Sequence, residues 1–125
     1  SHTISHRILT GLRNEEIIRE IRDSKDILES QLGNKIDSFA YPVGTRADFD
    51  DAIVEMVKTH NYTCACSNVY GMNDENSDTF ALKRIGIETT DCFFLFKQKL
   101  DGTLNIMSFK DTKFFQQLKR IFFKL

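Results

Sequence analysis

Apolar side chains between residues 14 and 32 recur every three or four positions, and charged side chains fill the opposite side. This spacing predicts an amphipathic helix with one buried and one solvated face. Asn14 suits the N-cap of this helix, and Gly33 suits its end. The buried stripe is expected to contain Ile17, Ile21, Ser24, Leu28 and Leu32.

Short strand-like and helical segments alternate along the rest of the chain. Pro42 and Gly44 interrupt the first strand. Asp48 or Asp50 suits the cap of the helix that follows, and Asn61 suits its left-handed end. The order predicts an α/β fold with a mostly parallel sheet. The predicted strands are 36–41, 62–67, 81–87 and 103–109, and the predicted helices are 50–60, 91–102 (capped by Asp91) and 111–125, with a polar loop at 69–80.

Aromatic residues indicate where the core is expected. Phe39 and Tyr41 alternate on the first strand, so they share one face, which we expect to be buried. Phe93, Phe94 and Phe96 are expected to form the core side of their helix.

The composition is that of an ordinary globular domain. At 125 residues the chain can form one modest domain. A net charge of −1 argues against a globally basic nucleic-acid binder, and no apolar run reaches the roughly 18 residues of a membrane span. Cys64, Cys66 and Cys92 are an odd number, so we expect buried reduced thiols rather than a disulfide framework.

The opening stretch "SHTISHRILT" places His2 and His6 four residues apart. Two imidazoles at this spacing can reach one metal ion if the backbone between them turns helically. The spacing alone leaves open whether the pair is a metal site or an accident of the sequence. A short His-x-x-x-His occurs by chance, and "SH" at a chain start can be a cleavage scar.

Longer blocks change this picture. The histidine motif is followed by the helix "SK-x-x-LE-x-x-LG" at 24–33 and by "FAYPVG" at 39–44. In order and spacing, residues 1–102 resemble the polysaccharide deacetylases, the NodB-homology carbohydrate esterases. The resemblance implies part of a distorted (β/α) barrel without its N-terminal strands, followed by a strand and a basic amphipathic helix over 103–125.

The resemblance also implies a chemistry, the metal-dependent hydrolysis of acetyl groups from the sugars of a polysaccharide. His2, His6 and an aspartate would hold zinc or another divalent metal, which activates water. The backbone N–H of Val43 would bind the oxyanion. Tyr41 and Pro42 would contact substrate, although core packing is the alternative for Tyr41.

The chain departs from the family pattern in its carboxylates. The family's aspartate pair, one metal ligand and one base, lies N-terminal to the histidine motif. We therefore expect this chain to be the C-terminal part of a deacetylase that is inactive alone. The acidic residues near the expected site have simpler structural roles as caps or solvated charges: Asp37, Asp48, Asp50 and Asp51.

Two further positions differ from the family. Ala40 stands where many members carry an arginine that orients the base. Arg84 can send a guanidinium into the same space, or it is an ordinary arginine at a strand end. The late histidine that serves as general acid has no match, because His60 is expected on the surface.

Three functions remain open from the sequence: a metal-dependent carbohydrate deacetylase, a non-catalytic relative that binds glycans or partners, and a small α/β interaction module. We expect a polysaccharide partner and no nucleic acid. A homodimer through exposed sheet edges is a further expectation. The helix at 111–125 either packs on the domain or contacts an anionic membrane surface. A bacterial cell envelope or cytoplasm would suit this chemistry.

Overall fold

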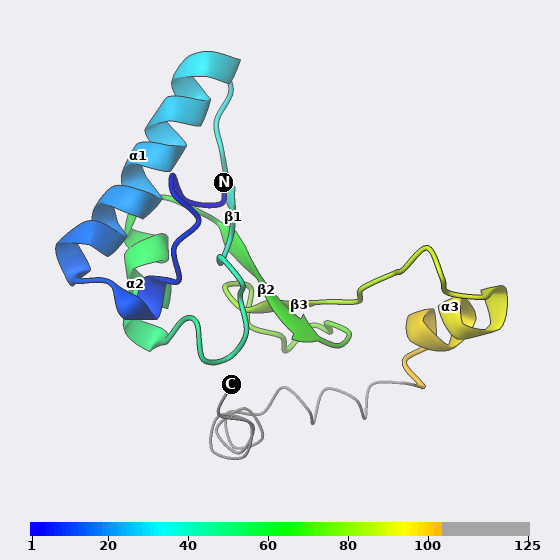
Figure 1. Ribbon diagram of the computed structural model, residues 1–125. Coiled ribbons are helices and arrows are strands. Elements are labelled where there is room, and N and C mark those ends of the chain that lie inside the picture. Colours follow the sequence, from blue (N-terminus) through cyan, green and yellow to red (C-terminus); the bar gives the residue numbers. More distant parts are fainter. Residues whose placement is uncertain (104–125) are drawn as a thin grey trace.

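The computed structural model describes residues 1–103, which contain three helices and a three-stranded sheet (Figure 1). A short 3-10 turn, η1, precedes them at Leu9–Gly11. The helices are α1 (Asn14–Leu32), α2 (Asp51–Thr59) and α3 (Phe93–Leu100). The strands are β1 (Ser38–Ala40), β2 (Cys64–Tyr70) and β3 (Leu82–Arg84).

The sheet has the order β1-β2-β3, and both pairings are parallel. Ser38 lies opposite Cys64, and Ala40 lies opposite Cys66. On the other edge of β1, the Ser1 amino group donates to the Ser38 carbonyl (2.8 Å), and the Ala40 N–H donates to the Ser1 carbonyl (2.9 Å). Ser1 is thus held as the next parallel strand would be. The predicted α/β class with a parallel sheet is confirmed.

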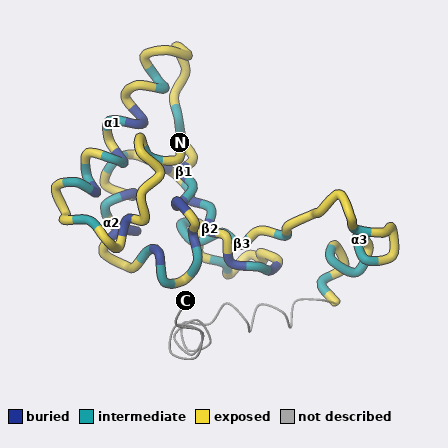
Figure 2. The backbone as a smooth tube through the Cα atoms, in the orientation of Figure 1, coloured by how far each residue is buried: buried dark blue, intermediate teal, exposed yellow. Residues whose placement is uncertain are grey.

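Helices α1 and α2 cover one face of the sheet and enclose the core with it (Figures 1 and 2). Along β2, alternate residues are buried, as a strand with one covered face requires. Phe39 and Tyr41 are buried as predicted. The core cluster contains Leu9, Ile17, Ile21, Phe39, Tyr41, Ile53, Val54, Val57, Tyr62 and Ala65.

The ends of the first two helices show why they stop where they do. The N-cap of α1 is Arg13, whose N–H donates to the Glu16 carboxylate (3.2 Å), so the prediction of Asn14 as the cap was wrong by one residue. Gly33 ends α1 in the left-handed conformation that glycine adopts without a steric penalty. Asp50 caps α2 by accepting the Ile53 N–H (2.9 Å), and Asn61 follows with a positive φ, both as predicted.

Other boundaries differ from the sequence-based expectation. Strand β1 is shorter than 36–41, and β2 continues to Tyr70, which the sequence places in a loop. The N-cap of α3 is Cys92, because Asp91 instead accepts the Glu88 N–H and pairs with Lys99. The elements predicted at 103–109 and 111–125, and the division of the chain at 102, fall at or outside the edge of the described residues.

The prediction of a buried aromatic face on α3 was wrong. The helix lies apart from α1 and α2 at the end of an extended segment (Figure 1). Phe93 and Phe94 are 80% and 69% exposed, and Phe96 is half-buried. The cysteines are free thiols as expected, but Cys64 and Cys66 are only half-buried and Cys92 is exposed. No helix among the described residues is long and apolar enough to span a bilayer.

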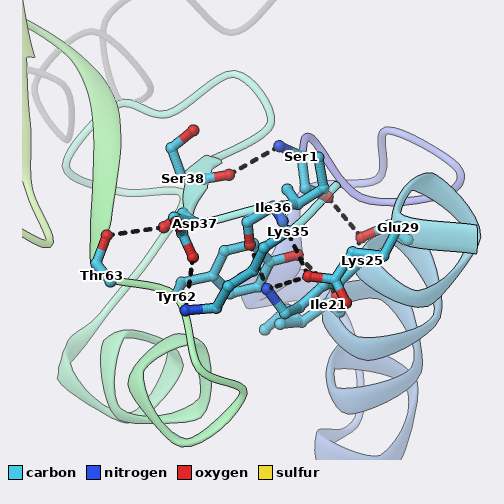
Figure 3. A network of polar contacts seen from close by, with 11 residues as sticks. Ser1, Ile21, Lys25, Glu29, Lys35, Ile36, Asp37, Ser38, Tyr62 and Thr63 are labelled. Atoms are coloured by element: carbon cyan, nitrogen blue, oxygen red, sulfur yellow. Dashed lines mark hydrogen bonds and ion pairs between the residues drawn. The ribbon is translucent and has the colours of Figure 1, made fainter. Parts of the chain in front are cut away.

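A buried lysine joins α1 to the starts of β1 and β2 (Figure 3). Lys25 is 7% exposed, and its Nζ donates to the Ile36 carbonyl and pairs with Glu29 (2.8 Å). The ammonium lies 4.7 Å from the ring centroid of Tyr62, whose hydroxyl donates to the Ile21 carbonyl (3.1 Å). The Ile36 N–H and Lys25 hold the pKa of the Glu29 carboxyl below its usual value.

Replacing Lys25 tests this network. Lys25→Met keeps the aliphatic stem but leaves the Ile36 carbonyl without its donor and Glu29 without its cation. We expect the free energy of unfolding, measured by urea denaturation, to fall by about 1–3 kcal/mol. The control is Lys35→Met, because Lys35 pairs with Asp37 on the surface. That change should cost less than about 0.5 kcal/mol, and equal losses would contradict the argument.

Candidate functional site

The candidate site begins with His2, which directly follows the residue that pairs with β1. Its Nδ1 lies 2.7 Å from the Ala40 carbonyl oxygen. Because a carbonyl only accepts hydrogen bonds, Nδ1 must carry the proton. A neutral imidazole in this tautomer has its lone pair on Nε2. Metal-binding histidines are commonly oriented in this way by a hydrogen bond from the other ring nitrogen.

The turn from Thr3 to His6 brings the second imidazole to the first. The ring centroids of His2 and His6 are 4.7 Å apart and their planes meet at 71°. Thr3 and His6 adopt positive φ angles of 63° and 58°, and the His6 N–H donates to the Thr3 hydroxyl (3.1 Å). The two rings therefore meet through a strained turn rather than the helical turn that the spacing suggested.

A carboxylate of α1 binds the outside of this turn. Glu20 accepts the N–H groups of Ile4 (2.8 Å) and Ser5 (2.9 Å) and the Ser5 hydroxyl. Burial raises the pKa of the Glu20 carboxyl, but the hydrogen bonds from Ser5 and Ile4 outweigh it, so the net pKa is lowered. Sequence reasoning missed Glu20, because helical periodicity placed it among the solvated charges of α1.

A second tight turn follows β1. Val43 and Gly44 have φ angles of 58° and 71°, and the Gly44 N–H donates to the Pro42 carbonyl (2.6 Å). The Asn68 N–H donates to the Gly44 carbonyl (2.7 Å), which fixes the turn to β2. Within the described part of the chain, the Val43 N–H makes no hydrogen bond, and its side chain is exposed. The turn thus offers an unused donor.

The two predicted substrate-contacting residues lie in the core. Tyr41 and Pro42 are fully buried. The Tyr41 hydroxyl donates to the Phe80 carbonyl (2.9 Å), and its ring stacks on Phe49 with centroids 4.2 Å apart. Burial raises the pKa of the Tyr41 hydroxyl well above its usual value. This placement favours the core-packing alternative for Tyr41, and contact with substrate stays a prediction for both residues.

Arg84 lies at the last position of β3 and is exposed. Its Nε donates to the Ser67 carbonyl of β2 (2.6 Å), which fixes the start of the guanidinium group. His2 is bound at the carboxyl end of β1 with His6 beside it, and Val43 follows that end in the chain, whereas Arg84 ends β3 on the far side of β2. Its role in orienting a base stays a prediction.

Two of the acidic residues near the expected site have the roles that the sequence suggested, since Asp50 caps α2 and Asp37 pairs with Lys35 on the surface. Asp48 does not: it is buried and accepts the N–H and hydroxyl of Thr45. Among residues 1–103, no three His, Cys, Asp or Glu side chains are grouped so that they could share a metal ion. Among the described residues, no third His, Cys, Asp or Glu side chain therefore joins His2 and His6.

The model of the family described as polysaccharide deacetylase matches residues 1–65, which contain both turns and β1. The chain belongs to the polysaccharide deacetylase family. Enzymes of this family are hydrolases and are generally metal-dependent. The family resemblance stated from the motifs is thus confirmed. No curated protein sequence matches the chain.

Solved polysaccharide deacetylases share the fold. The deacetylase PplD of Streptococcus pyogenes, solved in complex with acetate, is 25% identical and superposes with a TM-score of 0.72 over 79% of this chain and 42% of its own. A polysaccharide deacetylase from Bacillus cereus is 27% identical, with a TM-score of 0.67 over 80% of this chain and 31% of its own. The chain thus spans less than half of each, consistent with part of a deacetylase barrel.

The tight turn that follows β1 depends on Gly44. A Cβ at this position would lie 2.9 Å from the Tyr41 carbonyl oxygen and 3.0 Å from the Asn68 nitrogen. Gly44→Ala should therefore lower the free energy of unfolding by about 2–4 kcal/mol, measured by thermal or urea denaturation.

The matched control is Gly33→Ala, because Gly33 has a similar φ of 66° but open space around the added Cβ. It should cost about 1 kcal/mol, the conformational penalty alone. If both variants lose the same stability, the close approach at Gly44 is not what requires glycine there.

Proposed function

We propose that this chain takes part in the metal-dependent removal of acetyl groups from the sugars of a polysaccharide. The carrying observation is the placement of His2 and His6 side by side, with the Nε2 of His2 left free by the Ala40 hydrogen bond. The Val43 amide follows three residues after Ala40, at the same end of β1.

His2 and His6 would hold the metal, and their chemistry fits a zinc ion. Zinc is commonly bound by imidazole nitrogens, and catalytic sites keep a position open for water. When bound, the ion would supply a Lewis acid that lowers the pKa of that water and polarises a carbonyl oxygen. The resemblance assigns the third ligand to an aspartate, and no such group completes the site within residues 1–103.

Residues of the chain would act on the other groups of the reaction. Water adds to the acetyl carbonyl carbon, and the carbonyl oxygen becomes an oxyanion. The N–H of Val43 would donate to that oxygen, because it has no other acceptor among the described residues. The bond from carbon to the sugar nitrogen or oxygen then breaks, and a proton passes to the leaving atom, which yields acetate and a free amine or hydroxyl.

The nearest chemical support comes from the relatives. The Streptococcus pyogenes deacetylase was solved with acetate, the product that such a hydrolysis releases. The Bacillus cereus relative is named as a polysaccharide deacetylase. A polysaccharide substrate for this chain's protein, with the cell envelope as its setting, is the corresponding proposal.

Zinc titration calorimetry tests the ligand pair. We expect zinc to bind the chain, and His2→Ala or His6→Ala to weaken the affinity at least tenfold, because each removes one coordinating nitrogen. The control is His60→Ala. His60 lies at the end of α2 with its Nδ1 2.6 Å from the Met56 carbonyl, away from the pair.

Zinc binding that survives both His2→Ala and His6→Ala would refute the pair as ligands. It would favour the alternative of a deacetylase relative that binds glycans or partners without catalysis. Weakening by His60→Ala alone would instead assign the observed zinc to a different site.

A further inference from the structure

The turn that carries His2 and His6 has little packing to hold it. Ile4 is 53% exposed, and Ser5 and His6 are exposed as well. Thr3 and His6 both occupy the left-handed region, which residues other than glycine rarely adopt. Without an external restraint, such a turn would relax and separate the two imidazoles. The hydrogen bond from the His6 N–H to the Thr3 hydroxyl holds the turn from within, and its contacts with α1 restrain it from outside.

We infer that Glu20 is a positioning residue that holds the Thr3–His6 turn in the conformation that brings His2 and His6 together. The role of that pair in metal binding rests on the function proposed above. The restraint on the turn itself does not, because it concerns only the geometry of the chain.

One carboxylate collects three donors from two successive residues. Oε2 accepts the N–H groups of Ile4 and Ser5, and Oε1 accepts the Ser5 hydroxyl. Successive backbone N–H groups in a turn form a concave anion site, and hydrogen bonds to an ionised acceptor are stronger than neutral ones. Ile4 and Ser5 lie between the two left-handed residues, so anchoring both amides fixes the turn on either side.

The anchor is rigid because it belongs to a packed helix. Glu20 directly precedes Ile21, which is fully buried in the core. Two of the donors are backbone N–H groups of the turn, and the third, the Ser5 hydroxyl, binds the other oxygen and so fixes the rotation of the carboxylate that they share. No hydrogen bond joins Glu20 to either imidazole among the described contacts, so it acts through the backbone of the turn and not on the reacting atoms.

Proton NMR of the metal-free chain provides a readout of this restraint. The wild type should show a nuclear Overhauser contact between the His2 and His6 rings and slow amide exchange at Ile4 and Ser5. In Glu20→Ala, the contact should disappear, and exchange at these two amides should become at least tenfold faster. Glu20→Gln should largely restore both, because its one carbonyl oxygen can still accept the two backbone N–H groups.

The matched control is Glu15→Ala, because Glu15 lies on the same helix and its side chain makes no hydrogen bond within the described part of the chain. It should leave the ring contact and both exchange rates unchanged. If circular dichroism shows that Glu20→Ala unfolds α1, Ser5→Ala decides, since it removes only the hydroxyl donor from an exposed residue. Faster exchange at Ile4 and Ser5 in that variant supports the inference.

A wild type without the ring contact, or a Glu20→Ala variant that keeps it, would overturn the inference. The inference would also fail if Glu15→Ala disrupted the ring contact as much as Glu20→Ala does. If Glu20→Ala unfolds α1, unchanged amide exchange at Ile4 and Ser5 in Ser5→Ala would likewise overturn it. Zinc affinity, measured afterwards on the same variants, should fall at least tenfold in Glu20→Ala. The NMR measurement uses no metal, so it tests the role of Glu20 independently of zinc binding. A chain that fails to bind zinc would refute the proposed function but not the inference about Glu20.

Discussion

The buried ammonium of Lys25 is the contact on which the relative placement of helix and sheet depends. It binds the carbonyl of Ile36 just before β1, pairs with Glu29 within α1, and lies over Tyr62 just before β2. A buried charge is stable in few arrangements, because each partner that it loses leaves part of its desolvation free energy uncompensated. Sliding α1 along the sheet by one turn would break the contacts with Ile36 and Tyr62, whereas the pair with Glu29 would move with the helix.

Because Lys25 and Glu20 lie on the same helix, the placement of α1 by Lys25 also places the residue that binds the histidine turn. Glu20 lies five residues before Lys25, about 7.5 Å along the axis at 1.5 Å per residue. The same helix therefore fixes its own position with Lys25 and the histidine turn with Glu20. On the sheet side, Ala40 fixes the His2 ring, so the imidazole pair is held from two elements that Lys25 keeps in register. Residues held in unusual φ regions persist only where their surroundings determine them in this way.

Much of this architecture follows from the sequence, because periodic burial is a strong signal. The Asp50 cap, the parallel sheet and the burial of Ile17, Ile21 and Ser24 on α1 follow from spacing and turn residues alone. The predicted stripe was wrong at its end, because Leu28 is only half-buried and Leu32 is 58% exposed. The motif around His2 also indicated the family. The sequence failed where tertiary placement overrides local pattern. Phe93 and Phe94 have the spacing of a core face, but their helix lies away from the sheet, and no local rule contains that information.

In the candidate site, too, local sequence pattern predicted some features and tertiary placement determined the others. Motif resemblance indicated the residue types, but not the left-handed turn or the carboxylate that binds it. Glu20 makes its contacts 15 and 16 residues away along the chain, so periodicity could only describe it as one more exposed charge. The burial of Tyr41 was the reverse case, since strand alternation favoured it and the structure agrees.

The left-handed valine after β1 has a consequence for the unfolded chain. Glycine would adopt the φ of 58° at Val43 without the steric penalty of about 1–2 kcal/mol that a side chain incurs. Glycine would also widen the range of conformations open to the denatured turn, which folding must then give up. A β-branched residue narrows the range of the denatured turn, but toward extended, negative φ. The unused amide of Val43 is therefore held against the preference of its own residue by neighbouring contacts, such as the hydrogen bond from Asn68 to Gly44.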